Sequence, residues 1–158
     1  MQSPLLFFAA LSLACAPISR AVAAEKEALS IRTGTGLLTF QVELAVSQQE
    51  RERGLMGRTE LPEGSGMLFL FPTDRVARFW MVNTPLSVDA LFIARDGTIR
   101  KIAEEMEPLS SRVFSSDVPV KAVLEIRGGE AKRAGIRVGD KVLHPFFGVP
   151  QGSPGVGR

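Results

Sequence analysis

The stretch Gly66-Met67-Leu68-Phe69-Leu70-Phe71 decides the fold, because it carries no polar side chain at any position. A strand with one face in water alternates apolar and polar residues, whereas an unbroken apolar run of this length is typical of a strand that is buried on both faces. Residues 66–71 therefore predict a central strand with apolar layers on both sides. Pro72-Thr73-Asp74 follows it and predicts a turn that ends the strand.

Further strand patterns lie on both sides of this run. Upstream, residues 37–44 alternate apolar and polar side chains and predict a strand with one buried face, with residues 29–32 as a short partner. Asp96-Gly97 is a strong signal for a hairpin turn further downstream. The remaining predicted strands cover residues 76–82, 88–94, 98–106, 120–126 and 141–144.

Two short helices complete the pattern. Ser47-Gln48-Gln49-Glu50 is a capping box, in which Ser47 accepts a hydrogen bond from the third amide and Glu50 reaches back, and Gly54 can end this helix. A second helix is expected over residues 130–134, before Gly135. Seven or eight strands with two short helices predict a mainly β fold, a compact single-domain barrel or sandwich.

The N-terminus predicts export to the periplasm or secretion from a bacterial cell. Residues 5–16 are apolar apart from Ser12, and Ala21-Val22-Ala23-Ala24 offers small residues for cleavage, so residues 1–24 are typical of a secretory signal peptide. The apolar run is shorter than the roughly 20 residues that span a membrane. Ser12-Leu13-Ala14-Cys15 partly resembles a lipobox, so lipidation at Cys15 is an alternative to simple cleavage.

Length and composition bound the remaining classes of function. The 158 residues suit one domain, which we place at residues 25–144, and the Gly- and Pro-rich residues 145–158 are expected to be a disordered tail. The net charge is +2 with interspersed signs, which argues against nucleic-acid binding. Cleavage after Ala24 removes the only cysteine and every thiol function with it. We expect no cofactor, no metal site and no transmembrane segment; the oligomeric state stays open.

The run Phe79-Trp80-Met81-Val82-Asn83-Thr84-Pro85 contains the only tryptophan and predicts a functional site. Large apolar side chains beside turn-forming polar residues can build a pocket wall with a polar mouth. On a strand, Trp80 and its neighbours face opposite sides, so either Trp80 faces the core and its neighbours the cleft, or the reverse. Met81 and the nearby Met56 are typical core residues that can also line a cleft.

The polar candidates each have a structural and a functional interpretation. Asn83 and Thr84 can bond their own backbone in a turn, or they can orient a polar ligand. Arg58 can clamp a carboxylate or phosphate, lie in solvent, or pair with Asp89. Asp89 lies in an apolar strand, where it pairs with Arg58 or Arg78, caps a turn amide, or faces a cleft with a raised pKa.

Several motifs occur in a fixed order between residues 37 and 144. They are Leu55-Met56-x-Arg58, Gly66-Met67-Leu68-Phe69, Phe79-Trp80-Met81-x-Asn83-Thr84, Asp89-x-Leu91-Phe92-Ile93 and Gly135-Ile136-x-x-Gly139-Asp140. In this order they resemble the domain of unknown function 192 family, small bacterial and archaeal proteins that are often exported. The resemblance implies a mostly β fold and no established activity. Residues 129–140 also resemble the second half of a PDZ domain, but the carboxylate-binding loop and groove helix of that domain have no obvious counterpart.

These patterns favour a non-catalytic protein that binds a small polar or anionic ligand or a peptide end. We expect Asp89 to orient Arg58 at a cleft with an aromatic and methionine-lined wall. The residues of this cleft are Trp80, Met56, Met81, Arg58, Asn83, Thr84 and Asp89. No Ser/His/Asp arrangement, P-loop or Rossmann motif indicates an enzyme, so no catalytic residue is predicted. Two alternatives stay open: a small hydrolase that uses Asp89 or Glu43, and an envelope partner-binding or structural protein with an exposed apolar patch.

Overall fold

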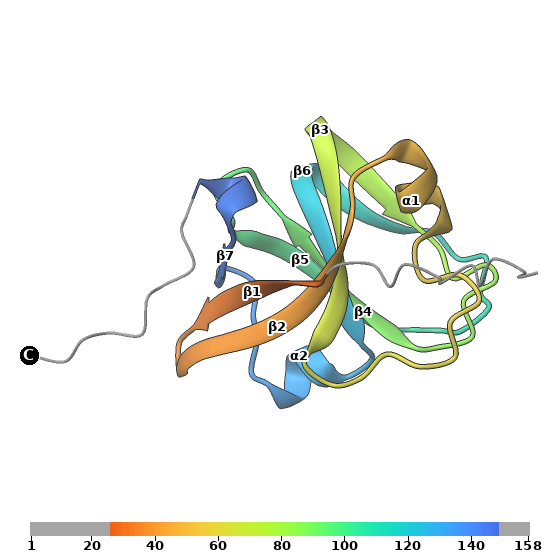
Figure 1. Ribbon diagram of the computed structural model, residues 1–158, viewed down its shortest axis with the longest axis horizontal. Coiled ribbons are helices and arrows are strands. Elements are labelled where there is room, and N and C mark those ends of the chain that lie inside the picture. The colour runs from red at the N-terminus through yellow and green to blue at the C-terminus, as the bar shows by residue number, and fades with distance from the viewer. Residues whose placement is uncertain (1–25, 149–158) are drawn as a thin grey trace, which may run out of the picture.

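A sheet of seven strands that curls into a half-barrel makes up most of the computed structural model, which describes residues 26–148 (Figure 1). Across the sheet the strands are ordered β5-β4-β6-β3-β2-β1-β7. Only β2 and β3 run parallel to each other; the other neighbouring pairs are antiparallel. The predicted mainly β fold is confirmed. The strands are β1 (Lys26–Thr33), β2 (Gly36–Ala45), β3 (Ser65–Phe79), β4 (Val88–Ile93), β5 (Ile99–Met106), β6 (Phe114–Arg127) and β7 (Lys141–Leu143).

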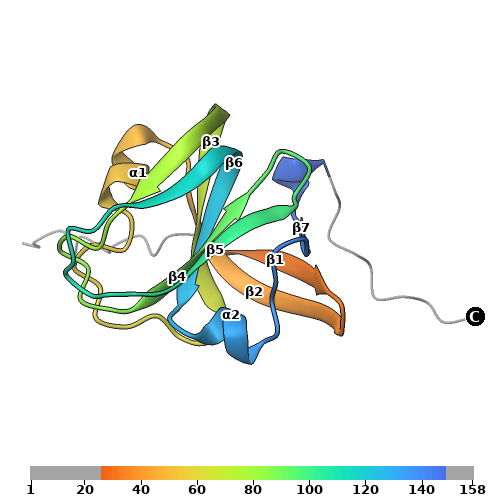
Figure 2. The same cartoon turned by 180° about the vertical axis from the view of Figure 1, so that it is seen from behind.

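The two edges of the sheet meet at one end of the half-barrel. Thr98, just before β5, forms an antiparallel bridge with Lys141 in β7. The Val142 N–H donates to the Gly97 carbonyl across 2.8 Å, and Figure 2 shows the β4–β5 hairpin beside β7. Gly97 has φ 81°, and a Cβ there would lie 2.5 Å from the Val142 carbonyl oxygen, so the position requires glycine. The hairpin predicted at Asp96-Gly97 is confirmed.

The three central strands β3, β4 and β6 are buried on both faces. β3 is buried without a break over residues 65–71, as the apolar run predicts, and β4 is buried at all six positions. One face of these strands lines the interior of the half-barrel. The apolar residues of that interior include Leu29, Phe40, Leu68, Leu91 and Leu124. The other, outer face forms a second apolar cluster that includes Leu55, Phe69, Met81, Phe92 and Val123.

Helix α1 (Gln48–Arg53) begins and ends where the sequence predicts. The Glu50 N–H donates to Ser47 Oγ at 3.1 Å and the Ser47 N–H donates to the Glu50 carboxylate at 2.7 Å, so the capping box is confirmed. The N–H groups of Ser47 and Val46 also hold the pKa of Glu50 below its usual range. Gly54 ends the helix with φ 46°, and a Cβ there would lie 3.1 Å from the Phe69 ring, so α1 joins the outer face of β3 closely.

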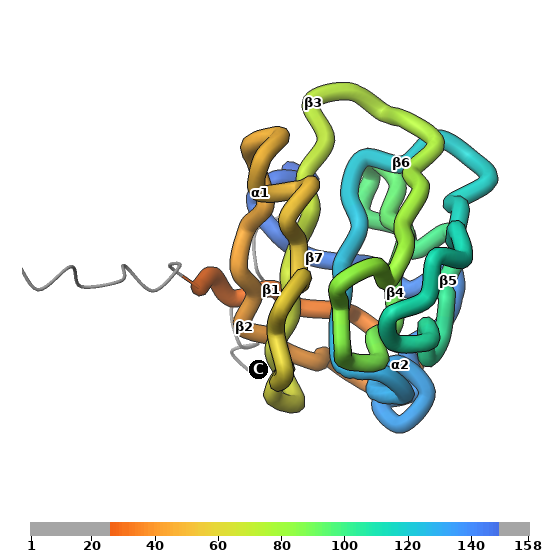
Figure 3. The backbone as a smooth tube through the Cα atoms, turned by 90° about the vertical axis from the view of Figure 1, so that its right-hand side faces the viewer, coloured from red at the N-terminus to blue at the C-terminus, as the bar shows by residue number. Residues whose placement is uncertain are grey.

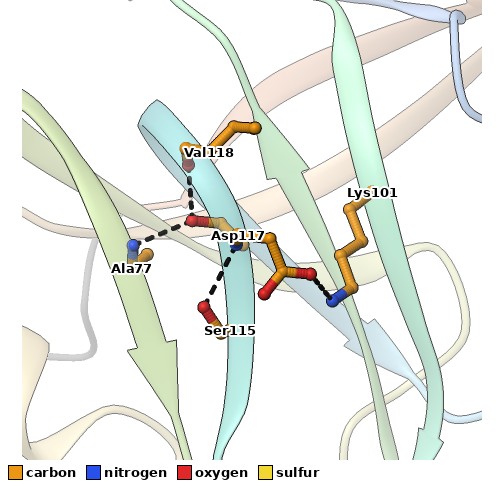
Figure 4. A network of polar contacts seen from close by, with 6 residues as sticks. Ala77, Lys101, Ser115, Asp117 and Val118 are labelled. Atoms are coloured by element: carbon orange, nitrogen blue, oxygen red, sulfur yellow. Dashed lines mark hydrogen bonds and ion pairs between the residues drawn. The ribbon is translucent and has the colours of Figure 1, made fainter.

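Strand β3 is longer than predicted, because Pro72-Thr73-Asp74 does not end it. β2 pairs with β3 only as far as Phe69, so Pro72 lies at a sheet edge where its missing N–H costs no ladder bond. Pairing with β6 resumes beyond a register shift, and a second irregularity follows at Val76. There Ser116 Oγ accepts from the Ala77 N–H at 2.9 Å and donates to the Val118 carbonyl of β6 at 2.7 Å. Figure 4 labels Ala77 and Val118, the two partners of this hydroxyl. The predicted turn is therefore wrong: the segment is a bulged continuation of the strand.

The chain after β7 packs onto the sheet instead of leaving it at once. Pro145–Phe147 form a 3-10 helix, η1, and Phe147 is buried. The first residues of the expected disordered tail are therefore ordered and belong to the domain. The rest of that tail, residues 149–158, lies outside the described residues. The predicted signal peptide also lies outside them, so export stays a prediction. No helix within residues 26–148 has the length and hydropathy that crossing a membrane requires.

Asp89 on β4 ties the sheet to helix α2 (Glu130–Arg133), which covers one end of the half-barrel (Figures 1 and 3). Its fully buried carboxylate accepts three backbone N–H bonds, from Glu105 at 2.7 Å, Gly129 at 2.9 Å and Ala131 at 2.9 Å. Glu105 has φ 45° at an irregularity in the β4–β5 pairing. Gly129, the N-cap of α2, has no side chain to cap the helix. One carboxylate therefore serves both a bulge and a helix start.

We expect Asp89→Asn to lower the free energy of unfolding by about 3 kcal/mol, because the new amide turns an N–H donor toward a backbone donor. Urea unfolding followed by circular dichroism measures the change. Asp74→Asn is the control, since Asp74 forms an exposed ion pair with Arg95 at 3.1 Å and its loss should change stability by less than about 0.5 kcal/mol. Equal effects of the two substitutions would contradict the anchoring role of Asp89.

Candidate functional site

A pocket of about 460 Å³ lies on the outer face of the sheet, between α1, the second half of β3 and the loop that follows β3. Part of its wall is apolar and part is polar. The rings of Phe69 and Phe79 meet edge to face in this wall, with centroids 5.0 Å apart. The other apolar residues of the wall are Leu55, Met56, Phe71, Ala77 and Met81. The volume lies in the range of small-molecule sites in proteins.

Charged side chains surround the mouth of this pocket. They are Arg51, Glu52 and Arg53 on α1, and Arg75 and Arg78 on β3. The Arg51 guanidinium donates to the carbonyl oxygens of Val46 and of Leu70, the latter at 3.1 Å. Arg75 lies over the Phe71 ring at 5.6 Å. Apart from Arg51, the side chains of these arginines have neither an ion pair nor a hydrogen bond to any residue between 26 and 148. The mouth therefore has a net positive charge and is open to an anion.

Glu125 on β6 is the buried acidic group of this pocket. Its side chain is 5% exposed, and its neighbours across the sheet are Met67 on β3 and Ala90 on β4. No hydrogen bond or ion pair from the described residues reaches its carboxyl group. Burial raises the pKa of Glu125 to about 8, because an ionised carboxylate would lose its hydration there. At pH 7 the pocket therefore holds a neutral carboxyl group without a partner.

The structure brings four of the seven predicted site residues to this pocket: Met56, Trp80, Met81 and Thr84. Trp80 follows the end of β3 and is 50% exposed, whereas Met81 is 1% exposed. The interpretation of Trp80 as a core residue is therefore wrong, and so is the strand predicted to continue to Val82. Thr84 is buried, and its hydroxyl donates to the Val82 carbonyl at 3.4 Å, as in the turn interpretation.

Arg58, Asn83 and Asp89 do not line the pocket, and the predicted pairing of Asp89 with Arg58 is wrong. Arg58 donates to both carboxylate oxygens of Glu43, with an Nη1–Oε1 distance of 2.6 Å. This bonding lowers the pKa of Glu43 and raises the pKa of Arg58. Asn83 is a turn residue with φ 57°, and its carbonyl accepts from the Gly57 N–H at 2.7 Å.

Glu43 and Asp89 face opposite sides of the sheet. Glu43 is in register with Met67, on the outer face, whereas Asp89 is in register with Ile126, whose side chain belongs to the half-barrel interior. The two carboxylates therefore do not converge in one pocket, as a hydrolase built on both would require. No group of three or more His, Cys, Asp or Glu side chains within residues 26–148 has the spacing of a metal site.

Sequence reasoning missed Glu125, because the alternation in residues 120–126 grouped it with Lys121 on a polar face. A signal was present, since Val123 lies on the same face and is apolar. Residues 122–126 are otherwise all apolar, like residues 66–71, and such a run predicts burial on both faces. A single acidic residue in a doubly buried strand is the pattern that could have identified this position.

Comparisons with known proteins agree with this fold. The DUF192 family, described as "Uncharacterized ACR", matches residues 29–144. A crystal structure from Sinorhizobium meliloti 1021, of a protein named a "putative transcription regulator", is 41% identical with a TM-score of 0.77, and the match covers 80% of this chain and 99% of that one. A protein of unknown function from Novosphingobium aromaticivorans DSM 12444 is 37% identical with a TM-score of 0.76, over 83% and 94% of the two chains. No curated protein matches the chain significantly.

The raised pKa of Glu125 predicts how stability depends on pH. Below about pH 4.5 the Glu125 carboxyl is neutral in both the folded and the unfolded protein. Between pH 4.5 and pH 8 it ionises only in the unfolded chain. Relative to Glu125→Gln, the protein should therefore lose stability as the pH rises from 4.5 to 8, by a few kcal/mol in total, and level off above 8.

Urea unfolding of the two proteins between pH 4 and 9 measures this difference. The matched control is Glu52→Gln, at the exposed mouth of the same pocket, which should leave the pH dependence unchanged. If the free energies of unfolding of the wild type and Glu125→Gln differ by the same amount at every pH, Glu125 ionises normally in the folded protein.

Proposed function

The chain belongs to the DUF192 family, and we propose that it is a non-catalytic binding protein whose outer-face pocket takes a small anion with an apolar body. The observation that carries this proposal is that aromatic and methionine side chains share one pocket with arginines that form no ion pair within residues 26–148. Apolar walls favour a hydrocarbon or aromatic part of a ligand. Guanidinium groups bind carboxylates and phosphates well. A ligand with both features matches both parts of the pocket.

Trp80 supports this proposal from the edge of the pocket. Its indole is half exposed although it is one of the largest apolar surfaces in the chain. A flat apolar group at a pocket mouth is a stacking surface for a ligand that enters there. The arginines nearest to it along the chain, Arg75 and Arg78, are exposed and can move toward an anion. Binding should therefore alter the surroundings of this single tryptophan.

A partner-binding protein is the second candidate function. Leu109 is 64% exposed and Val113 is 53% exposed, in the loop between β5 and β6. This loop lies against the one that carries Trp80, because the Leu109 N–H donates to the Thr84 carbonyl at 3.0 Å. Regulation of transcription, suggested by the name of the S. meliloti relative, has less support, since a net charge of +2 with interspersed signs gives DNA phosphates little to bind.

Titration with octanoate, followed by Trp80 fluorescence and calorimetry, tests the proposed function. Octanoate should bind, and replacing Arg75 and Arg78 together by Gln should weaken binding about fivefold, because each exposed charge contributes under about 1 kcal/mol. Octanol, which has the same chain and no charge, should be insensitive to this double substitution.

The matched control replaces Arg32 and Arg100 by Gln, two exposed arginines outside the pocket. It keeps the change in net charge and should leave octanoate binding unaltered. Absence of octanoate binding, or equal weakening by both double substitutions, would contradict an anion site at this mouth and would favour the partner-binding candidate.

A further inference from the structure

Glu125 gives the pocket a second polar group, which differs in chemical character from the charged side chains of the mouth. The Glu125 carboxyl lies on the buried sheet surface between apolar neighbours, and it has no hydrogen-bond partner in the described part of the protein. A buried polar group without a partner destabilises a fold, so most such groups are satisfied by protein atoms or by water. Glu125 lines the pocket, so water or a ligand in the pocket can satisfy its carboxyl group.

None of the charged groups on the elements around Glu125 forms an ion pair or hydrogen bond with its carboxyl group within residues 26–148. On α1 these groups are Arg51, Glu52 and Arg53, and on β3 they are Arg75 and Arg78. Across the sheet, Asp89 on β4 faces the other side, and Glu43 on β2 is two strands away and is neutralised by Arg58. Burial of the carboxyl group raises the pKa of Glu125.

We propose that the pocket recognises its ligand at two places, with the arginines of the mouth binding an anionic end and the Glu125 carboxyl donating a hydrogen bond to a neutral oxygen at the inner end. This inference rests on the proposed function. The ligand class is an anionic amphiphile that carries a distal carbonyl or similar acceptor. A plain hydrocarbon tail fits less well, because it would seal the carboxyl group without a partner.

Two other inner groups fit the pocket less well. A second anionic group would be buried beside the Glu125 carboxyl group, which forms no ion pair with the described residues, and burying a charge without a partner is unfavourable. An ammonium group would have to pass a positively charged mouth and would require Glu125 to ionise. The neutral carboxyl group is a ready donor for an acceptor oxygen and needs no change of protonation.

The test compares matched probes of 6, 8 and 10 carbons: the straight-chain carboxylates, their analogues with a ketone at the penultimate carbon, and the ω-amino acids. At pH 6.5, at the best-fitting length, the keto acid should bind at least about fivefold more tightly than the plain acid, because it satisfies Glu125. At pH 9.5 the ionised carboxylate can no longer donate, so this preference should disappear.

Two variants separate recognition from general effects on the pocket. Glu125→Gln keeps a donor that does not titrate, so it should retain the keto preference at both pH values. Glu125→Leu has no donor and should prefer the plain acid. The comparison of probes on the unmodified protein stands even if a variant fails to fold.

The outcomes distinguish this inference from the function on which it rests. Binding of plain and keto acids with equal affinity at pH 6.5 overturns the inner recognition and leaves the anion site intact. A preference for the ω-amino acids overturns it in favour of an ion pair with Glu125. Absence of binding by every carboxylate overturns both the anion site and the inference.

Discussion

The burial of the central strands on both faces is the constraint on which the rest of the structure depends. β3, β4 and β6 place apolar side chains toward the half-barrel interior and toward the outer cluster alike. Burial of apolar surface contributes about 25 cal/mol per Å², so this double layer is the main source of stability. At the buried positions of these strands a polar side chain has little access to water. An acidic residue there must find partners in the protein or lose its charge.

Asp89 and Glu125 meet this constraint in opposite ways, although Glu125 is in register with the residue next to Asp89. Asp89 receives three backbone N–H bonds and thereby fixes a bulge and a helix start. Glu125 receives none and faces a pocket of about 460 Å³. Asp89 therefore has a structural role. Glu125 has no hydrogen-bond partner within residues 26–148 and lines the pocket, where a bound molecule can reach its carboxyl group.

The sequence predicted most of the fold, because side-chain periodicity and turn chemistry depend on neighbouring residues. The capping box at Ser47 and the hairpin at Asp96-Gly97 are examples. Pairings between distant segments were not predictable: nothing local shows that Arg58 binds Glu43, which lies 15 residues away. The burial of Glu125 was not predictable for the same reason. Alternation along its strand indicates which residues share a face, but the packing of α1 and its following loop, which bury Glu125, is not visible in the local sequence.

The burial of Glu125 implies that the folded protein holds it as a neutral carboxyl group at pH 7. The most direct measurement is a pH titration of its side-chain carboxyl carbon by ¹³C NMR, with the signal assigned by its absence in Glu125→Gln. We expect a titration midpoint near pH 8. A midpoint near 4.5, the ordinary value for glutamate, would mean that water or a cation reaches the carboxylate, and it would contradict the account.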